Sequence, residues 1–328
     1  MKVYVRAPYE EKCLNELKVI FNEVVYEPWT DNGERFYEDQ MLENLNRVQP
    51  DVLITELDRV TEKVLKGYPK LKLIGDCRGN PANIQTEACT AAGVPVLCTP
   101  GRNKQAVAEM VIGMILTFER KSIPSIQWVK DGKWVEGTTP YYTWMGHEIQ
   151  GKKVGIVGFG AVGRAVAKLL DAFGCNISFY DPFVKEDVGN CKKKSLEEIF
   201  ANSDIVTLHA AVTDSTKGMI NAELLNSMKK TALFVNAARS ALVDNEALMD
   251  VLNKKKIAGA VLDVIDVEPP TEKELEILKC PNVLLTPHTY GATYEITDHQ
   301  SRIMNDRIKK YYAKEELDKI VFNKEVLR

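Results

Sequence analysis

Three residues that can bind anions or move protons follow predicted strands in the last third of the chain: Arg239, Glu268 and His288. A histidine can take the proton of a secondary alcohol while hydride leaves for a nicotinamide. A carboxylate hydrogen-bonded to the imidazole orients the ring and favours its protonated form. A guanidinium offers a planar fork for the carboxylate of a 2-hydroxy or 2-keto acid. The set therefore predicts His288 as acid/base, Glu268 as its partner and Arg239 as the group that binds substrate.

Each of the three also has a structural interpretation: a surface ion pair for the arginine, a helix cap or exposed acid for the glutamate, and a packed imidazole for the histidine. The chain has four histidines. We expect His299 on a solvated helix face and His147 in a loop. His209 ends a predicted strand and can touch a cofactor there, but no carboxylate motif accompanies it.

A glycine-rich turn follows the apolar run 153–157 and opens a predicted helix, with the pattern G-x-G-x-x-G. Gly158 permits the tight turn, Gly160 lets backbone approach a pyrophosphate, and Gly163 lets helix and strand pack closely. The pyrophosphate then lies on free N–H groups at the helix N-terminus, where Ala161 and Val162 stand. The segment 146–153 resembles a P-loop but lacks its final Ser or Thr and precedes a strand, so we reject it.

Asp181 ends the second predicted strand of this region. It lies about 20 residues beyond the turn, where an acidic residue accepts the ribose hydroxyls of a dinucleotide. Its carboxylate would repel a 2′-phosphate, so the sequence favours NAD over NADP. A structural glycine-rich turn with a surface aspartate is the alternative.

Strands and helices alternate twice along the chain, which is typical of α/β proteins with parallel sheets. The carboxyl ends of parallel strands form the edge at which ligands bind, so we expect the three chemical residues on one rim. We predict two doubly wound domains. A Rossmann NAD-binding domain, residues 102–292, is inserted in a flavodoxin-like substrate domain of residues 1–101 and 293–328. The second alternation has six predicted strands: 153–157, 176–180, 205–209, 232–236, 259–263 and 283–286.

Composition excludes several classes of partner. With a formal net charge of −3, the chain lacks the excess positive charge that binding to nucleic acid or an anionic membrane requires. No apolar stretch reaches the ~18–20 residues of a membrane span. Seven dispersed cysteines without a C-x-x-C pair indicate reduced packing thiols of a cytoplasmic protein and no metal site. The helix predicted at 104–120 is apolar nearly all round, which suggests a subunit interface, with a domain core as the alternative.

The chain resembles the D-isomer-specific 2-hydroxyacid dehydrogenases, in the manner of phosphoglycerate dehydrogenase without a regulatory domain. Five segments carry the resemblance: 158–163, 209–252, 263–269, 286–288 and 321–323. It implies that Arg239 binds the substrate carboxylate and carbonyl, that Glu268 pairs with the acid/base His288, and that Asp263 contacts the nicotinamide amide. It also implies a homodimer. The expected cofactor-binding residues are Gly158, Gly160, Ala161, Val162, Gly163, Asp181, His209, Ala210, Ala237 and Asp263.

The resemblance further implies that a loop of the substrate domain, residues 77–80, binds substrate through backbone N–H groups, with Gly79 among them. This chain has Arg78 where many relatives carry a small residue, Ser240 where a glycine is common, and His-Ala-Ala-Val at 209–212. We hypothesise that Arg78 and Arg102 favour a substrate with a second anionic group. The alternative is that both arginines are solvated or paired.

Two other functions remain open at this point. Some relatives act as transcriptional co-repressors on this fold, so a non-enzymatic NAD-sensing protein is the competing class. The presence of an arginine, a glutamate and a histidine at the three chemical positions argues against it. Within the enzymes, a formate dehydrogenase is the runner-up, but hydride loss from formate leaves no hydroxyl proton for a Glu–His pair to remove.

Overall fold

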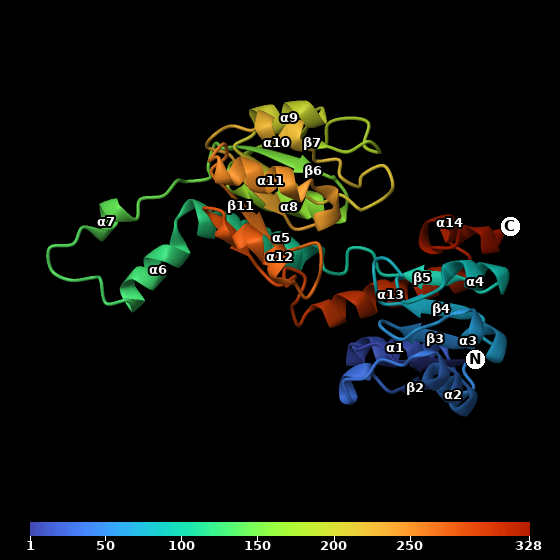
Figure 1. Ribbon diagram of the computed structural model, residues 1–328. Coiled ribbons are helices and arrows are strands. Elements are labelled where there is room, and N and C mark those ends of the chain that lie inside the picture. Colours follow the sequence, from blue (N-terminus) through green and yellow to red (C-terminus); the bar gives the residue numbers. More distant parts are fainter. The chain divides into compact units, whose positions relative to one another are not determined.

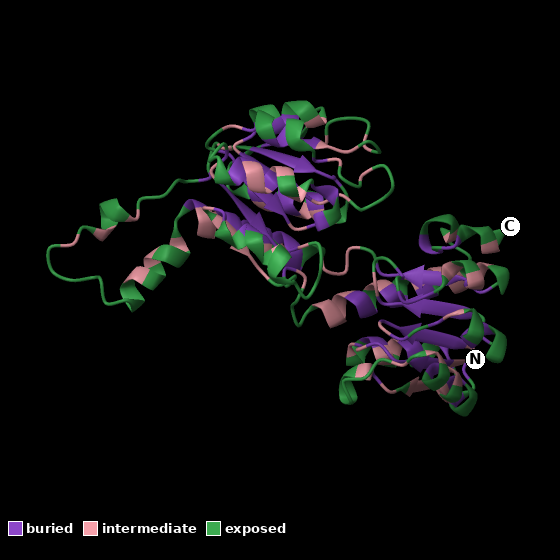
Figure 2. Ribbon diagram, viewed as in Figure 1, coloured by how far each residue is buried: buried purple, intermediate pink, exposed green.

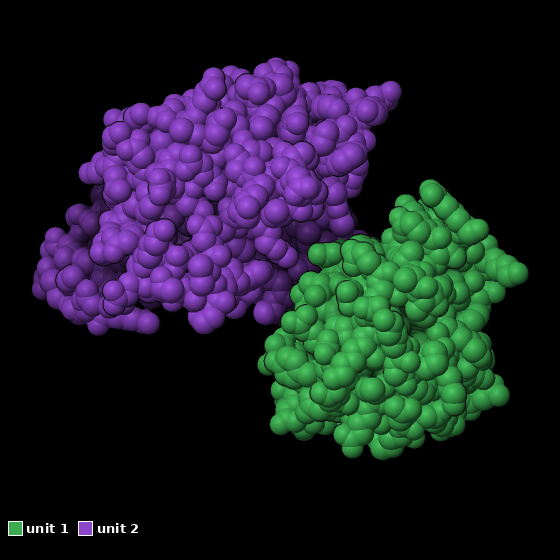
Figure 3. All heavy atoms as spheres, turned by 45° about the vertical axis from the view of Figure 1, so that its right-hand side comes forward, with its two compact units in different colours: residues 1–102, 293–328 green, residues 103–292 purple.

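The strands of this chain form two separate parallel sheets, one in each of two units. The computed structural model describes residues 1–328. Unit 1 comprises Met1–Arg102 with Thr293–Arg328, and unit 2 comprises Asn103–Ala292 (Figure 3). The first break lies one residue later than expected, so Arg102 belongs to unit 1.

Unit 2 contains a seven-stranded parallel sheet in the order β12-β11-β10-β9-β6-β7-β8. This is the doubly wound order of a dinucleotide-binding sheet, with the order reversing between β6 and β9. The six predicted strands are all present. The added strand, β8, has two lysines and no apolar periodicity to reveal it. The strands are β6 (Lys153–Val157), β7 (Asn176–Tyr180), β8 (Lys192–Lys193), β9 (Ile205–Leu208), β10 (Leu233–Asn236), β11 (Gly259–Leu262) and β12 (Val283–Leu285).

Helices cover both faces of this sheet (Figure 1). Successive residues of the central strands alternate between two core clusters, and the strands therefore read as continuous apolar runs. On one face lie α5 (Lys104–Glu119) and α8 (Ala161–Ala172). On the other lie α9 (Leu196–Asn202), α10 (Ala222–Ser227) and α11 (Asn245–Asn253), and a short α12 (Glu272–Leu275) follows β11.

Helix α5 contributes its apolar side chains to the core of unit 2. Val111, Ile112 and Ile115 are buried in the cluster that includes α8 and the sheet. The domain-core alternative therefore accounts for this helix, and its apolar character by itself does not mark a subunit interface.

An arm extends from the end of α5 (Figure 1). It contains α6 (Ser122–Lys130) and α7 (Pro140–Thr143), joined and followed by irregular chain up to β6. The sequence patterns predicted neither of these two helices. Most of the arm is exposed or only partly buried (Figure 2).

Unit 1 contains a five-stranded parallel sheet in the order β2-β1-β3-β4-β5. This is the flavodoxin-like order. Its strands are β1 (Lys2–Val5), β2 (Glu23–Tyr26), β3 (Val52–Thr55), β4 (Leu73–Asp76) and β5 (Val96–Cys98). Its helices are α1 (Glu11–Ile20), α2 (Glu38–Val48), α3 (Glu62–Gly67), α4 (Thr86–Ala91), α13 (Ile296–Ala313) and α14 (Leu317–Ile320).

The two ends of the chain share one core in unit 1. Helix α13 packs against α1 and β5, and Met304 lies beside Gly75 of β4, where a Cβ would stand 2.7 Å from the methionine sulfur. Asn305, buried on α13, accepts a hydrogen bond from the Tyr9 hydroxyl at 2.8 Å and donates one to the Cys13 carbonyl at 2.9 Å. The C-terminal helix is therefore part of the first sheet's packing.

All seven cysteines are buried and unpaired, in agreement with their interpretation as packing thiols. None of the helices has the length and apolar character needed to cross a bilayer.

A buried ion pair joins β1 to the loop after β3. The Arg6 guanidinium lies 3.3 Å from the Asp58 carboxylate, and both side chains are almost fully buried. Arg6 also donates to the carbonyls of Glu27 and Glu34, while Asp58 accepts from the Thr55 hydroxyl and the Phe36 N–H. The pair is therefore hydrogen-bonded on both sides, which a buried charge requires.

We predict that Asp58→Ala lowers the free energy of unfolding by about 3–5 kcal/mol, because it leaves the Arg6 charge buried and unpaired. Urea denaturation followed by circular dichroism measures the loss. Asp39→Ala is the matched control: its partner Lys63, 2.5 Å away, is exposed, so the cost is about 0.2–1 kcal/mol. Equal effects of the two substitutions would contradict the prediction.

Candidate active site

Three neighbouring loops at one edge of the unit 2 sheet carry the predicted chemical residues. Arg239 follows β10, Glu268 follows β11 and His288 follows β12, and these strands are adjacent and parallel. The sheet topology therefore gathers residues separated by up to about fifty positions on one edge, as the sequence predicted.

His288 and Glu268 are in direct contact. The ring Nδ1 of His288 lies 2.7 Å from Oε2 of Glu268, and both side chains are about two-fifths exposed. No protein group bonds to Nε2, which leaves that nitrogen free to exchange a proton with a ligand. A carboxylate on Nδ1 fixes the tautomer and stabilises the imidazolium.

The backbone of His288 adopts a left-handed conformation with φ +55°, which is uncommon for a residue other than glycine. The buried carboxylate of Asp263 holds the surrounding loop in place. It accepts hydrogen bonds from the Thr286 hydroxyl at 2.7 Å and from the N–H groups of Thr289 and Tyr290 at 2.8 and 3.0 Å. Asp263 therefore acts on the histidine loop, and its expected contact with the nicotinamide amide stays a prediction.

Arg239 is exposed and contacts neither His288 nor Glu268. Its Nη1 donates to the Ala238 carbonyl at 2.6 Å. Asn236, at the end of β10, holds the loop from below: its amide nitrogen donates to the Arg239 carbonyl at 3.0 Å and its oxygen accepts from the Ala238 N–H.

Ser240 ties the arginine loop to the glutamate loop. Its hydroxyl donates to Asp266 at 2.6 Å, and the Asn245 side chain donates to both of these groups at 2.9 Å. Sequence reasoning noted Ser240 only as a departure from the family pattern and missed Asp266 and Asn245. The only signal was position: Asp266 follows a predicted strand, and Asn245 is the first residue of α11.

The glycine turn has the shape that a dinucleotide requires. Gly158 has φ +90°, and a Cβ there would stand 2.5 Å from the Ala210 nitrogen. A Cβ on Gly163 would stand 2.1 Å from the Gly158 carbonyl oxygen, whereas one on Gly160 would meet nothing within 4 Å. No side chain caps the helix that starts at Ala161. The turn therefore combines close packing with open space and free N–H groups, which fits a pyrophosphate.

His209 and Ala210 lie against this turn. The His209 N–H donates to the Val157 carbonyl at 2.7 Å. Its ring Nε2 lies 2.9 Å from the Thr207 hydroxyl, while Nδ1 is buried without a partner. Burial lowers the pKa of His209 to about 3, so the ring is neutral near pH 7. A neutral ring with one unpaired nitrogen is compatible with a cofactor contact.

The Asp181 carboxylate is held at the end of β7 by two backbone groups. It accepts hydrogen bonds from the Phe159 N–H at 2.7 Å and the Phe183 N–H at 2.9 Å. It therefore stands next to the glycine turn, where the sequence predicted it. Ala237, between Asn236 and the arginine, is partly buried at the same edge of the sheet.

The remaining histidines lie elsewhere. His147 is exposed, and its N–H donates to the Glu119 carbonyl. His299 has its Nδ1 at 3.1 Å from the Arg102 carbonyl, so it is a structural residue of unit 1 and not a solvated one. Arg78 and Gly79 also belong to unit 1, in the loop after β4.

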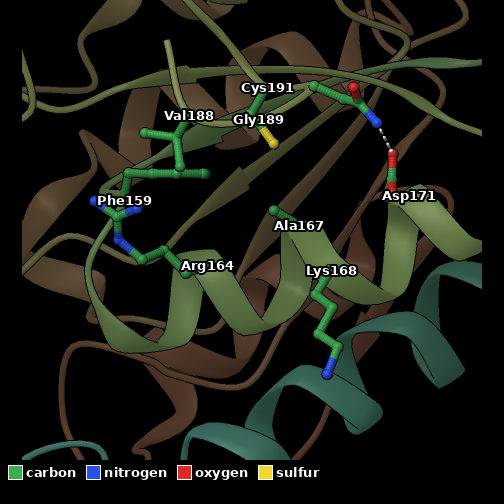
Figure 4. A pocket seen from close by; sticks show the side chains of 9 residues that line it. Phe159, Arg164, Ala167, Lys168, Asp171, Val188, Gly189 and Cys191 are labelled. Carbon is green, nitrogen blue, oxygen red and sulfur yellow. Dashed lines mark hydrogen bonds between the residues drawn. The ribbon is translucent and has the colours of Figure 1, made fainter. Parts of the chain in front are cut away.

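A cavity of about 340 Å³ lies beside α8 (Figure 4). It is lined by Phe159, by Arg164 and Lys168 of α8, and by the segment 188–191. Asn190 donates to Asp171 at 3.3 Å on its rim. It shares Phe159 with the glycine turn, but none of the residues predicted to bind cofactor or substrate lines it.

Comparisons with known proteins identify a family and similar structures. Residues 112–289 match the model of the "D-isomer specific 2-hydroxyacid dehydrogenase, NAD binding domain" family. The chain is 43% identical over its full length to "Putative 2-hydroxyacid dehydrogenase YoaD" of Bacillus subtilis, covering 96% of that protein. It is 34% identical over its full length to a "Glyoxylate reductase" of Thermofilum pendens, again over 96% of that protein. The TT0316 protein of Thermus thermophilus has a similar structure, with a TM-score of 0.78 at 28% identity over 98% of this chain and 100% of that one.

Substitutions at two glycines of the turn should have different effects, one on cofactor binding and the other on stability. We predict that Gly160→Ala changes the free energy of unfolding by no more than about 0.5 kcal/mol, because its Cβ meets open space. The same methyl group occupies the approach of the pyrophosphate and weakens NADH binding at least about tenfold. Fluorescence titration with NADH measures the affinity.

Gly163→Ala should instead lower the stability of the protein. Its Cβ overlaps a backbone oxygen, and we expect the free energy of unfolding to fall by about 1–3 kcal/mol. Gly113→Ala, at an open position of α5, is the control for both measurements. An unchanged NADH affinity in Gly160→Ala would show that the pyrophosphate does not lie on this turn.

Proposed function

Because the chain belongs to the D-isomer specific 2-hydroxyacid dehydrogenase family and is an NAD-dependent oxidoreductase, we propose that it interconverts a small D-2-hydroxy acid and its 2-keto acid. The observation that carries the proposal is the hydrogen bond of 2.7 Å between His288 and Glu268. A hydroxy acid gives up both a hydride and a hydroxyl proton, and only the proton needs such a pair.

His288 is the acid/base. When bound, the nicotinamide donates or accepts the hydride at the carbon that changes oxidation state. In the reductive direction, protonated His288 gives the proton on Nε2 to the carbonyl oxygen as that oxygen gains charge. Glu268 stabilises the imidazolium before the transfer and orients the neutral ring afterwards. In the oxidative direction the same nitrogen takes the hydroxyl proton.

Arg239 binds the substrate. Its guanidinium can accept the planar carboxylate through two parallel hydrogen bonds and polarise the neighbouring carbonyl oxygen. The bonds from Asn236 and Ser240 hold the arginine loop against its neighbours, which supports a fixed position for the charge.

Binding of the cofactor involves the turn and the residues around it. We assign the pyrophosphate to the turn from Gly158 to Gly163, the ribose to Asp181, and further contacts to His209, Ala210, Ala237 and Asp263. The carboxylate of Asp181 favours NAD over NADP because a 2′-phosphate would bring a second negative charge next to it. Unit 1 is the substrate domain in this proposal, with Arg78 and Gly79 as its substrate-binding residues.

A relative from Thermofilum pendens is named as a glyoxylate reductase. Glyoxylate is therefore the first acid to test, and reduction is the direction to test first. A purely NAD-sensing protein has no use for a carboxylate–imidazole pair with a free Nε2, so the enzyme is favoured over the sensor.

We predict that His288→Ala lowers kcat for keto-acid reduction by about 10²–10⁴-fold while NADH affinity stays unchanged, since general acid–base catalysis contributes that much. The rate is measured as the decrease in NADH absorbance at its maximum. Glu268→Gln lowers kcat less, and Arg239→Ala mainly raises KM. His147→Ala is the matched control, because this histidine is exposed and distant in sequence from the pair. Unchanged turnover in His288→Ala, or no turnover of any keto acid by the wild type, would refute the mechanism.

We further propose that the arm of unit 2 binds a second copy of the chain. Three apolar residues recur on α6, and Ile126 is 55% exposed. Beyond the helix, Tyr141 and Tyr142 are 79% and 71% exposed. Exposed apolar residues that gather on one segment are typical of protein–protein interfaces, and a two-fold axis uses the same segment of both copies.

The double substitution Ile126→Lys with Tyr142→Ser is expected to shift the mass in solution from twice 36.9 kDa to that of one 36.9 kDa chain. Size-exclusion chromatography with light scattering measures this. Val19→Lys, at a single exposed apolar residue of α1, leaves the dimer intact. A wild-type protein that elutes as a monomer would rule the dimer out.

A further inference from the structure

The segment that carries Glu268 has few hydrogen bonds of its own. Residues 264–270 lie between β11 and α12, outside any helix or strand. Their N–H and carbonyl groups form no backbone–backbone hydrogen bond, and the Ile265 N–H donates only to Oε1 of Glu268, at 3.4 Å. Backbone hydrogen bonds therefore do not fix the position of Glu268, and side chains must do so.

The side chain of Asp266 supplies this attachment. Its Oδ1 accepts hydrogen bonds from the Ser240 hydroxyl at 2.6 Å and from the Asn245 side-chain nitrogen at 2.9 Å. The same nitrogen also lies 2.9 Å from the Ser240 hydroxyl, so the three side chains form a closed triangle. Hydrogen bonds to a carboxylate are short and strong. We call these three residues the Asp266 clamp.

Both donors of the Asp266 clamp belong to well-packed parts of unit 2. Ser240 is buried, and it directly follows Arg239 as the first residue of the short helix η2 (Ser240–Leu242). Asn245 is the first residue of α11, whose apolar face is buried in the core. A group that is held by packed elements keeps its position better than one on a free loop. The clamp therefore attaches the glutamate segment to the core and to the arginine loop at once.

We propose that the Asp266 clamp fixes the separation of the two loops that carry Arg239 and Glu268, so that both act on one small acid. This inference rests on the proposed function, because it uses the roles assigned there. Arg239 holds the substrate carboxylate, and Glu268 orients the proton donor, so an error of about 1 Å between the loops costs up to about a hundredfold in rate. Asp266 takes no part in hydride or proton transfer and is a positioning residue.

The first test compares substitutions in the Asp266 clamp, with NADH and the best substrate among glyoxylate, hydroxypyruvate and oxaloacetate. We expect Asp266→Ala to lower kcat/KM by about 10- to 100-fold, through a lower kcat and a higher KM, with unchanged NADH affinity. Asp266→Asn keeps an acceptor oxygen for both donors and should stay within about fivefold of wild type. Ser240→Ala leaves the bond to Asn245 and should fall between these two variants.

A second test distinguishes positioning from general damage to the fold. When Glu268→Ala has already removed the group that Asp266 positions, adding Asp266→Ala should lower kcat by no more than about twofold further. In an Arg239→Lys background, Ser240→Ala should raise KM less than in wild type, because an ammonium has no planar fork to orient. Equal fold losses in wild type and in both backgrounds would contradict positioning and overturn the proposal.

Asp250→Ala is the matched control, since it removes an aspartate of α11 that pairs with Lys254 at 2.6 Å and is 46% exposed. Its kcat/KM should stay within about twofold of wild type. Thermal unfolding shows whether Asp266→Ala is folded, and Asp266→Asn and Ser240→Ala decide if it is not. Unchanged kcat/KM in Asp266→Ala would overturn this inference and leave the proposed function in place. Absence of turnover of all three acids by the wild type would instead overturn both.

Discussion

One buried carboxylate holds in place the loop of His288, the residue that we propose as acid/base. Asp263 directly follows β11 and accepts three hydrogen bonds from the loop after β12. Through these bonds it compensates a backbone conformation at His288 that a residue other than glycine rarely adopts. Glu268 comes from the same loop as Asp263, five positions later, so both contacts of the histidine loop arise from one strand end. The ring nitrogen left free is a consequence of this double attachment.

The site is built from loops, but its precision comes from the sheet. Asn236 and Asp263 are buried polar residues at the ends of adjacent strands. Asn236 forms hydrogen bonds with the loop that follows its own strand, and Asp263 forms them with the loop after the neighbouring strand. Ser240 and Asp266 then join two of the loops directly. The exposed residues to which we assign chemical roles are in this way fixed by buried polar residues behind them.

Sequence reasoning reached the parallel sheets, the glycine turn and the Glu–His pair because each leaves a local pattern: alternating elements, spaced glycines, and charged residues directly after apolar runs. It missed β2, whose four residues are at most half-buried and show no clean alternation, and β8, which has two charged residues. It could not predict that Arg102 has side-chain partners and Arg78 has none. The partners of Arg102, Glu56 and Gln300, lie far from it in the chain. The sequence pattern of α5 suggests a subunit interface because a helix that is apolar all round has the same pattern whether its own domain or a partner subunit buries it.

The shared core of unit 1 has a consequence for synthesis on the ribosome. Its five strands precede unit 2 in the chain, but Met304 and Ile308, which complete the packing against β1 and β4, follow unit 2. Unit 2 is a single continuous segment and can close its core as soon as β12 has left the exit tunnel. The sheet of unit 1 is therefore synthesised before the 18-residue helix α13 that completes its core, and all of unit 2 is translated in between. Unit 2 can therefore complete its core before unit 1 does.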